Sequence, residues 1–137
     1  MRRILLVSTA GADEPWLVTP TAQLAEETGA EITVLAVDDV ESQRFTALPR
    51  SELLRQAEAT ARQFADRLAE TGVPATPVAR PGPAAATAIE YADEIDADLI
   101  VVGSSRGRGV VKRLLGSLPL DLVRLSGRQV LVVAAPD

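Results

Sequence analysis

Four short apolar runs rich in valine, leucine and isoleucine are spaced along the chain, and each predicts a β-strand. They cover residues 4–7, 32–37, 99–102 and 130–133. Three of the runs are apolar throughout, and residues 32–37 contain a single polar position, Thr33. An apolar run without alternation is typical of a parallel strand that is covered on both faces, so we expect helices above and below the sheet.

A weaker fifth strand is predicted over residues 75–79. Pro74 precedes it and Pro77 interrupts it, and neither has a backbone amide that can donate to a neighbouring strand. Because such positions are tolerated at the edge of a sheet, we expect this strand to be the outermost one.

Segments with apolar residues three and four positions apart lie between these strands and predict amphipathic helices. The clearest covers residues 51–71, with Ser51 as its N-cap and Gly72 as its stop. Pro83 suits the first turn of the next helix, because that turn needs no amide donor. The three further helices are expected from Thr19 up to Gly29, over residues 83–95 and over residues 114–125.

Strands and helices therefore alternate along the chain, which predicts a doubly wound α/β sandwich with right-handed crossovers. A length of 137 residues suits one compact domain, so residues 1–137 are expected to form a single domain. Residues 38–49 show no clear period and are expected to form a surface loop that leads into the long helix.

Composition narrows the possible chemistry. The chain contains no cysteine and no histidine, which excludes disulfides, thiol nucleophiles, zinc sites of sulfur or imidazole, and histidine as a general base. Its 14 basic and 19 acidic residues give a formal net charge of −5, which repels nucleic acids and anionic lipids. No apolar run approaches the ~20 residues of a membrane span. We therefore expect a cytoplasmic protein that binds neither nucleic acid nor membrane.

Candidate chemistry is expected at the carboxyl ends of the strands, where open parallel sheets bind ligands. The richest such segment follows the fourth strand, where Gly103, Gly107 and Gly109 precede the pair Gly116 and Ser117. Glycines let backbone amides approach an anion, and a serine hydroxyl can donate to a phosphate oxygen. The segment is interpreted as a phosphate cradle, with simple turn geometry as the alternative.

Other motifs fit less well. No glycine is followed by lysine, which excludes a P-loop, and Lys112 stands where the dinucleotide fingerprint GxGxxG needs its third glycine. Asp38 and Asp39 suggest a metal site or a phosphoacceptor, but the aspartate and lysine that receiver domains carry after their third and fifth strands are missing. Solvation in a loop is the favoured interpretation of both aspartates. Trp16 either lines a pocket or packs on the sheet, which is the more frequent role.

The whole chain resembles the universal stress protein family. The segments that carry the resemblance are RRILLVST, TGAEITVLAVDD, DADLIVVGSSRGRGVVKRLLGS and QVLVVAAP. The ATP-binding branch of that family has G-x-x-G-x9-G-[S/T] after the fourth strand, and Gly103 and the pair Gly116-Ser117 match the ends of this motif. Arg106 replaces its middle glycine, and Thr9 stands where ATP-binding members tend to have an aspartate.

This resemblance implies a five-stranded parallel sheet of the adenine nucleotide α-hydrolase type, with strand order 3-2-1-4-5 and helices on both faces. It implies ATP, with Mg²⁺, as the ligand, and a homodimer formed through the last strand, Val130 to Ala134. Because Thr9 offers one hydroxyl and no charge, affinity is expected to be reduced. The implied nucleotide-binding residues are Thr9, Val37, Val102, Gly103, Arg106, Gly116, Ser117 and Leu118.

The sequence has no nucleophile beside a recognisable base and no hydrolysis motif, so it favours binding and regulation over catalysis and leaves slow ATP hydrolysis undecided. The leading hypothesis is a stress-response domain that binds ATP. A dimeric interaction module of the same fold, without a nucleotide, is the alternative that Thr9 and Arg106 favour. A small-molecule enzyme of an adenine-nucleotide-binding superfamily is a third hypothesis, and it lacks a reactive group.

Overall fold

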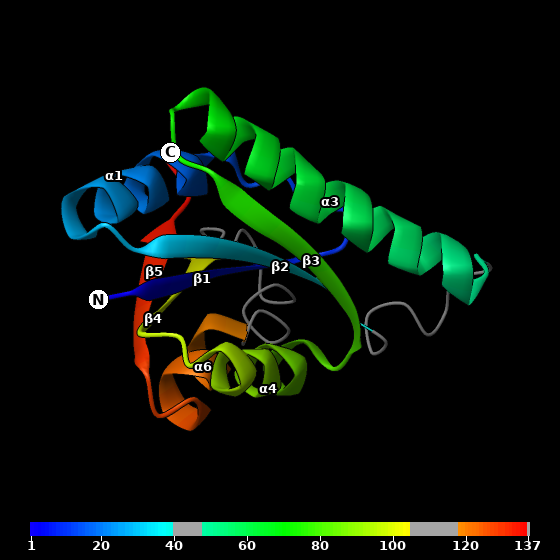
Figure 1. Cartoon of the computed structure of the whole chain (residues 1–137). Coiled ribbons are helices and arrows are strands. Elements are labelled where there is room, and N and C mark those ends of the chain that lie inside the picture. The colour runs from blue at the N-terminus through cyan, green and yellow to red at the C-terminus, as the bar shows by residue number, and fades with distance from the viewer. Residues whose placement is uncertain (40–47, 105–117, 137) are drawn as a thin grey trace.

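The structure, a computed structural model, describes residues 1–39, 48–104 and 118–136. Within these residues the chain forms a parallel sheet and the helices that cover it (Figure 1). The strands are β1 (Arg3–Thr9), β2 (Glu31–Asp39), β3 (Ala75–Gly82), β4 (Leu99–Ser104) and β5 (Gln129–Ala134). The helices are the 3₁₀ turn η1 (Pro15–Leu17), α1 (Val18–Thr28), α3 (Arg50–Glu70), α4 (Ala84–Ile95) and α6 (Leu118–Leu125).

The sheet has the strand order β3-β2-β1-β4-β5, and every neighbouring pair is parallel. This confirms the predicted order and the outermost position of β3. From β1 the chain builds outward to β2 and β3 on one side, and then returns to place β4 and β5 on the other side. The order therefore switches between β1 and β4, and a crevice for a ligand is expected at the carboxyl ends of these two strands.

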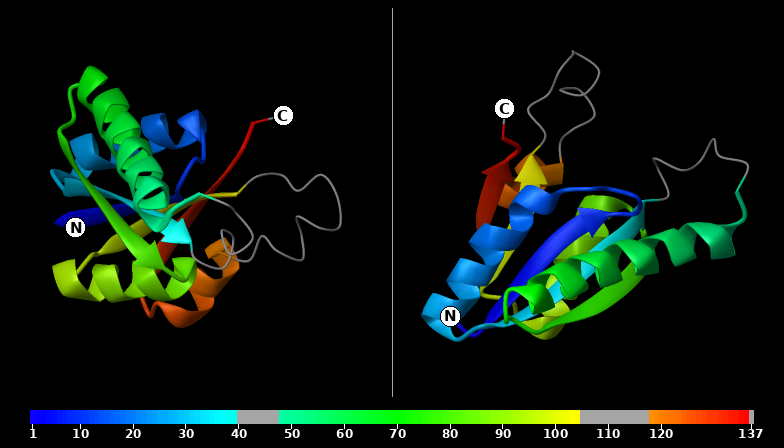
Figure 2. Two further views of the ribbon diagram at one scale, coloured as in Figure 1. Left: turned by 90° about the vertical axis from the view of Figure 1, so that its right-hand side faces the viewer. Right: turned by 90° about the horizontal axis from the view of Figure 1, so that it is seen from above.

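Helices cover both faces of the sheet (Figures 1 and 2). Ile4 and Leu6 of β1 belong to the core on the side of α1 and α3, whereas Leu5 and Val7 belong to the core on the side of α4 and α6. All four side chains are fully buried. The absence of polar alternation in the strands follows from this arrangement, since each strand needs apolar side chains on both faces.

Of three predicted helix ends, two starts were wrong and one stop was correct. Helix α3 begins at Arg50, after Pro49, so the prediction that Ser51 is the N-cap was wrong and Ser51 lies inside the first turn. Pro83 is the extended residue before α4 and not part of its first turn. Gly72 follows α3 with a φ of 90°, a left-handed conformation that favours glycine, and it ends the helix as predicted.

Two expectations concern segments at the limits of the described residues. Of the helix predicted over residues 114–125, the part from Leu118 is present as α6, and residues 114–117 lie outside the described residues. In the part of the chain that the structure describes, no helix is long and apolar enough to cross a membrane.

Candidate functional site

The predicted site residues Thr9 and Val37 lie side by side at the carboxyl ends of β1 and β2. Thr9 is half-buried, whereas the side chains of Val37 and Val102 are buried in the core that faces α4 and α6. These two valines can therefore offer only backbone groups to a ligand at the carboxyl ends of the strands. The carbonyl of Val37 already accepts a hydrogen bond of 2.9 Å from the amide of Ala10.

Gly103 follows Val102 in β4, and its partner across the β4–β5 pairing is Val133. Leu118 is the first residue of α6. It is half-buried and packs against the core on the side of α4 and α6. Arg106, Gly116 and Ser117 lie outside the described residues. The structure thus brings together Thr9, Val37, Val102 and Gly103 at the carboxyl ends of the strands. The phosphate cradle remains a prediction from the sequence.

The turn between β1 and α1 is hydrogen-bonded to two other elements, α3 and β5. The amide of Gly11 donates to Oγ1 of Thr60 on α3 at 2.9 Å. The indole Nε1 of Trp16 donates to the carbonyl of Val133 on β5 at 3.1 Å. Trp16 also packs against the core beneath α1 and α3, which confirms that it packs on the sheet. This turn therefore runs across the carboxyl ends of the strands, from α3 to β5.

Glu14 lies in this turn, and no sequence motif had pointed to it. Its Oε1 accepts a hydrogen bond of 2.9 Å from Oγ of Ser8, whose side chain is buried at the end of β1. Its Oε2 lies against the Cα of Gly103: a Cβ at that position would clash with this oxygen and would lie 3.1 Å from Cδ of Glu14. Gly103 therefore has a structural reason to be glycine that is independent of any phosphate.

Burial raises the pKa of the Glu14 carboxyl, and the hydrogen bond from Ser8 opposes this shift without cancelling it. Glu14 forms no ion pair with any residue that the structure describes. Its neighbour Asp13 differs, because it is largely exposed and pairs with Arg67 of α3 at 3.2 Å. A carboxyl group that is partly removed from water, and that forms no ion pair with a described residue, thus lies at the carboxyl ends of β1 and β4.

The interpretation of Asp38 and Asp39 as solvated loop residues was wrong. Both belong to β2, and the side chain of Asp38 is fully buried. Neither carboxylate oxygen of Asp38 has a hydrogen-bond partner, and Nη1 of the half-exposed Arg50 lies 3.5 Å from Oδ2. The extended β2 carries Asp38 beneath the start of α3, so this carboxylate is removed from water without full compensation.

A divalent cation has little protein support in this region. Within residues 1–39, 48–104 and 118–136, no group of three aspartate or glutamate side chains is arranged to hold a metal ion. Asp38, Asp39 and Glu14 are buried or partly buried near the carboxyl ends of the strands, and Asp38 and Glu14 already lie against Arg50 and Ser8. A Mg²⁺ ion at this edge would depend on oxygen ligands brought by the nucleotide itself.

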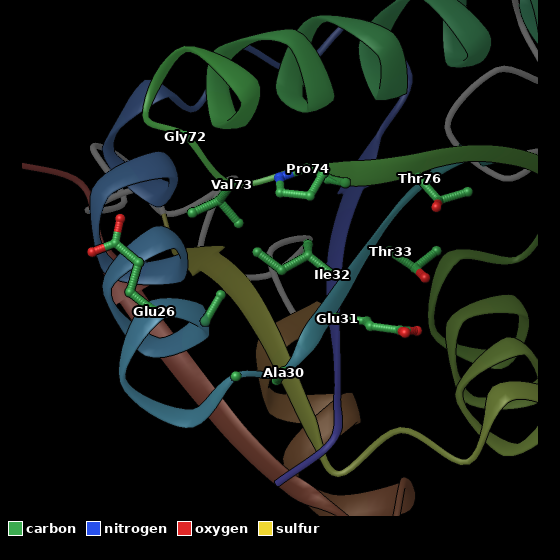
Figure 3. A pocket seen from close by; sticks show the side chains of 12 residues that line it. Glu26, Ala30, Glu31, Ile32, Thr33, Gly72, Val73, Pro74 and Thr76 are labelled. Carbon is green, nitrogen blue, oxygen red and sulfur yellow. The ribbon is translucent and has the colours of Figure 1, made fainter.

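One hollow lies at the amino ends of β2 and β3, away from the candidate site. It has a volume of about 650 Å³ and lies between the ends of α1 and α3 and the beginnings of β2 and β3. Figure 3 shows Ile32 and Val73 close together in this hollow, with Glu26 on α1 beside it. A second hollow, of about 510 Å³, lies between β3 and α4 around Arg80 and Tyr91. Neither includes Thr9 or Gly103, so the candidate site rests on strand topology and not on cavity size.

The strand order and the helices on both faces define this chain as a doubly wound α/β protein, whose switch point lies between β1 and β4. A family model described as the universal stress protein family matches residues 1–134, and the chain belongs to that family. This confirms the resemblance inferred from the sequence.

Solved structures support the same assignment. A universal stress protein in complex with cAMP is 28% identical, with 98% of each chain covered and a TM-score of 0.69. A universal stress protein from Archaeoglobus fulgidus is 18% identical and has a TM-score of 0.75, and the structure of the protein from that organism in complex with dAMP is 16% identical with a TM-score of 0.72. In both, 97% of this chain and 98% of the other chain are covered, and they show the fold alone. No protein with a curated description is similar enough in sequence to match.

Proposed function

We propose that this chain binds an adenine nucleotide at the carboxyl ends of β1, β2 and β4 and acts by binding and regulation, not by catalysis. The observation that carries the proposal is the position of Thr9, Val37 and Gly103 together at the switch point of the sheet. The relative at 28% identity, which is in complex with cAMP, supports adenosine as the part of the ligand to be recognised. ATP, the ligand expected from the sequence, belongs to the same class.

Each group has a defined part in this proposal. Backbone groups of Val37 and Val102 meet the adenine, because their side chains are turned into the core. The hydroxyl of Thr9 can donate and accept one hydrogen bond toward the ribose. The backbone of Gly103 meets the phosphate, together with Arg106, Gly116 and Ser117 as predicted from the sequence. Leu118 closes the site at the start of α6, and Mg²⁺ enters with the phosphates.

The exposed edge of β5 supports a second proposal, a homodimer. β5 pairs with β4 on one side, and its Val132 is 39% exposed. An unpaired apolar edge invites association with another strand, and a second copy of the same strand satisfies it. If the chain binds no nucleotide, it would act through this dimer alone. This is the alternative proposal of a dimeric interaction module. The cytoplasmic location and the absence of nucleic-acid partners stay predictions from the sequence.

Calorimetric titration of the ligand-stripped protein with Mg-ATP, cAMP, AMP and GTP tests the proposed function. We expect saturable heat with one adenine nucleotide per protomer and none with GTP. Gly116→Val is the site variant, since a branched side chain would block the approach of a phosphate, and its fold is checked by circular dichroism. Absence of heat with every adenine nucleotide at two temperatures would overturn the proposal and leave the dimeric interaction module.

A further inference from the structure

The Glu14 carboxyl is held at the crest of the sheet from several sides. Ser8 donates to its Oε1, and the backbone of Gly103 lies against its Oε2. Gly11 before it is bonded to α3, and Trp16 after it is bonded to β5. The flanking turn is fixed on both sides, and rotation of the carboxyl away from the end of β4 would break its hydrogen bond with Ser8.

The hydroxyl of Ser8 is a neutral donor, so it compensates the charge of this carboxyl only in part. No described cationic side chain pairs with Glu14, and Cδ1 of Leu17 contributes an apolar neighbour on the same side of Gly103. Two negative charges repel each other more strongly where water is partly excluded. A phosphate brought to the backbone of Gly103 would therefore be repelled by Glu14, and the repulsion increases with the charge of the phosphate.

We propose that Glu14 is a specificity-determining residue, which makes the site favour adenine nucleotides with a single phosphate charge over those with several ionised phosphates. This inference rests on the proposed function and deepens it. A cyclic phosphodiester carries one charge, a terminal monophosphate carries close to two at neutral pH, and an unchelated triphosphate carries more. The repulsion from Glu14 is therefore weakest for cAMP and strongest for metal-free ATP, and Mg²⁺ reduces it for ATP by lowering the net charge of the nucleotide.

The decisive variant is Glu14→Gln, because glutamine has the same shape and keeps an oxygen that can accept the hydrogen bond from Ser8. The matched control is Asp13→Asn, which removes the same charge one residue away, where the carboxylate is 71% exposed and pairs with Arg67. Both proteins and the unchanged chain are titrated with cAMP and with ATP, without divalent cation and with Mg²⁺, at one ionic strength.

In the unchanged chain we expect tighter binding of cAMP than of metal-free ATP. In Glu14→Gln the ratio of the two dissociation constants, ATP over cAMP, is expected to fall by about tenfold or more, and in Asp13→Asn to stay within about twofold. Glu14→Ala, which removes the carboxyl and its contact with Gly103, is a second variant should the glutamine side chain disturb the turn. It is expected to shift the ratio in the same direction.

The outcomes separate the two proposals. An unchanged ratio in both Glu14 variants, with nucleotide still bound, would overturn the role of Glu14 and leave the proposed function intact. An equal fall in Asp13→Asn would also overturn it, because the effect would then come from net charge alone. No binding of any adenine nucleotide by the unchanged chain and the Glu14 variants would overturn both proposals, whereas ATP binding by Glu14→Gln alone would support the specificity role.

Discussion

The carboxyl group of Glu14 occupies the space that a side chain on Gly103 would need. The two residues lie on different elements, the turn after β1 and the end of β4, and they meet at the point where the strand order switches. The packing of this chain itself therefore favours a glycine at the end of β4, because a larger residue would have to displace the Glu14 carboxyl from its hydrogen bond with Ser8. Its presence alone is weak evidence for a phosphate, and stability and binding experiments must be combined to separate the two roles.

Gly103→Ala is expected to lower the free energy of unfolding by about 1–3 kcal/mol, the usual cost of adding a methyl group to a packed position. The new Cβ would clash with Oε2 of Glu14 and lie 3.3 Å from Cδ1 of Leu17. Glu14 cannot turn aside without losing its hydrogen bond with Ser8. Urea denaturation of the two proteins measures the difference.

The double variant Glu14→Ala with Gly103→Ala provides the control. If the contact between these residues is the cause, most of the loss caused by Gly103→Ala should disappear when Glu14 is already alanine. Additive losses in the double-mutant cycle would show that the alanine is destabilising for another reason, such as its contact with Leu17.

Glu14→Gln is also expected to change how stability depends on pH. Burial raises the pKa of Glu14 above its ordinary value of 4.5, so the folded chain holds this proton more tightly than the unfolded chain. The protonated carboxyl favours folding below that ordinary value, and this contribution is lost as the pH rises through the raised pKa. Relative to Glu14→Gln, the unchanged chain should therefore gain stability as the pH falls from 7 toward 4.

The measurement is the free energy of unfolding in urea at several pH values for both proteins. Asp13→Asn serves as the reference, since Asp13 is largely exposed and its pairing with Arg67 lies on the surface. A difference between the unchanged chain and Glu14→Gln that stays constant from pH 7 to pH 4 would contradict the burial of Glu14 as a destabilising charge.

The fold could be predicted from the sequence because its signals are local. The apolar runs mark strands that are buried on both faces, and Pro74 and Pro77 mark β3 as an edge, so the alternation of elements follows directly. Helix starts were less accurate, since α3 begins at Arg50 and not after Ser51, and α4 begins at Ala84, after Pro83 and not with it. Pro49 is the extended residue before α3, so the helix starts directly after it and Ser51 is already helical instead of capping the helix.

The site was predicted only in part, for a different reason. Thr9 and Gly103 follow apolar runs, so their place at the crest of the sheet could be inferred from the direction of parallel strands. The burial of Glu14 and of Asp38 could not, because it depends on elements far away in the sequence, β4 for one and the start of α3 for the other. A polar residue in a segment without periodicity looks solvent-exposed until its neighbours in space are known.

Arg50→Ala is expected to destabilise the chain by about 1–3 kcal/mol, because it leaves the buried carboxylate of Asp38 without its cation. In an Asp38→Asn background the same change should cost much less, since no buried charge remains. Arg55→Ala is the matched control: its ion pair with Glu52 is on the surface of α3, and its loss should cost less than about 1 kcal/mol. Equal losses for Arg50→Ala in both backgrounds, measured by urea denaturation, would rule out the ion pair as the cause.

Val132→Glu is expected to convert a homodimer into monomers. Val132 lies in the middle of the edge strand β5 and is 39% exposed, so a two-fold pairing of β5 with its copy would bring two added carboxylates close together in a region that excludes water. Sedimentation equilibrium at micromolar concentration should give a dimer for the unchanged chain and a monomer for the variant.

Thr76→Glu is the control, because it adds the same charge to β3, the opposite edge of the sheet, where no pairing is proposed. A dimer that resists Val132→Glu but dissociates with Thr76→Glu would place the interface on β3, and a monomeric unchanged chain would exclude the dimer altogether.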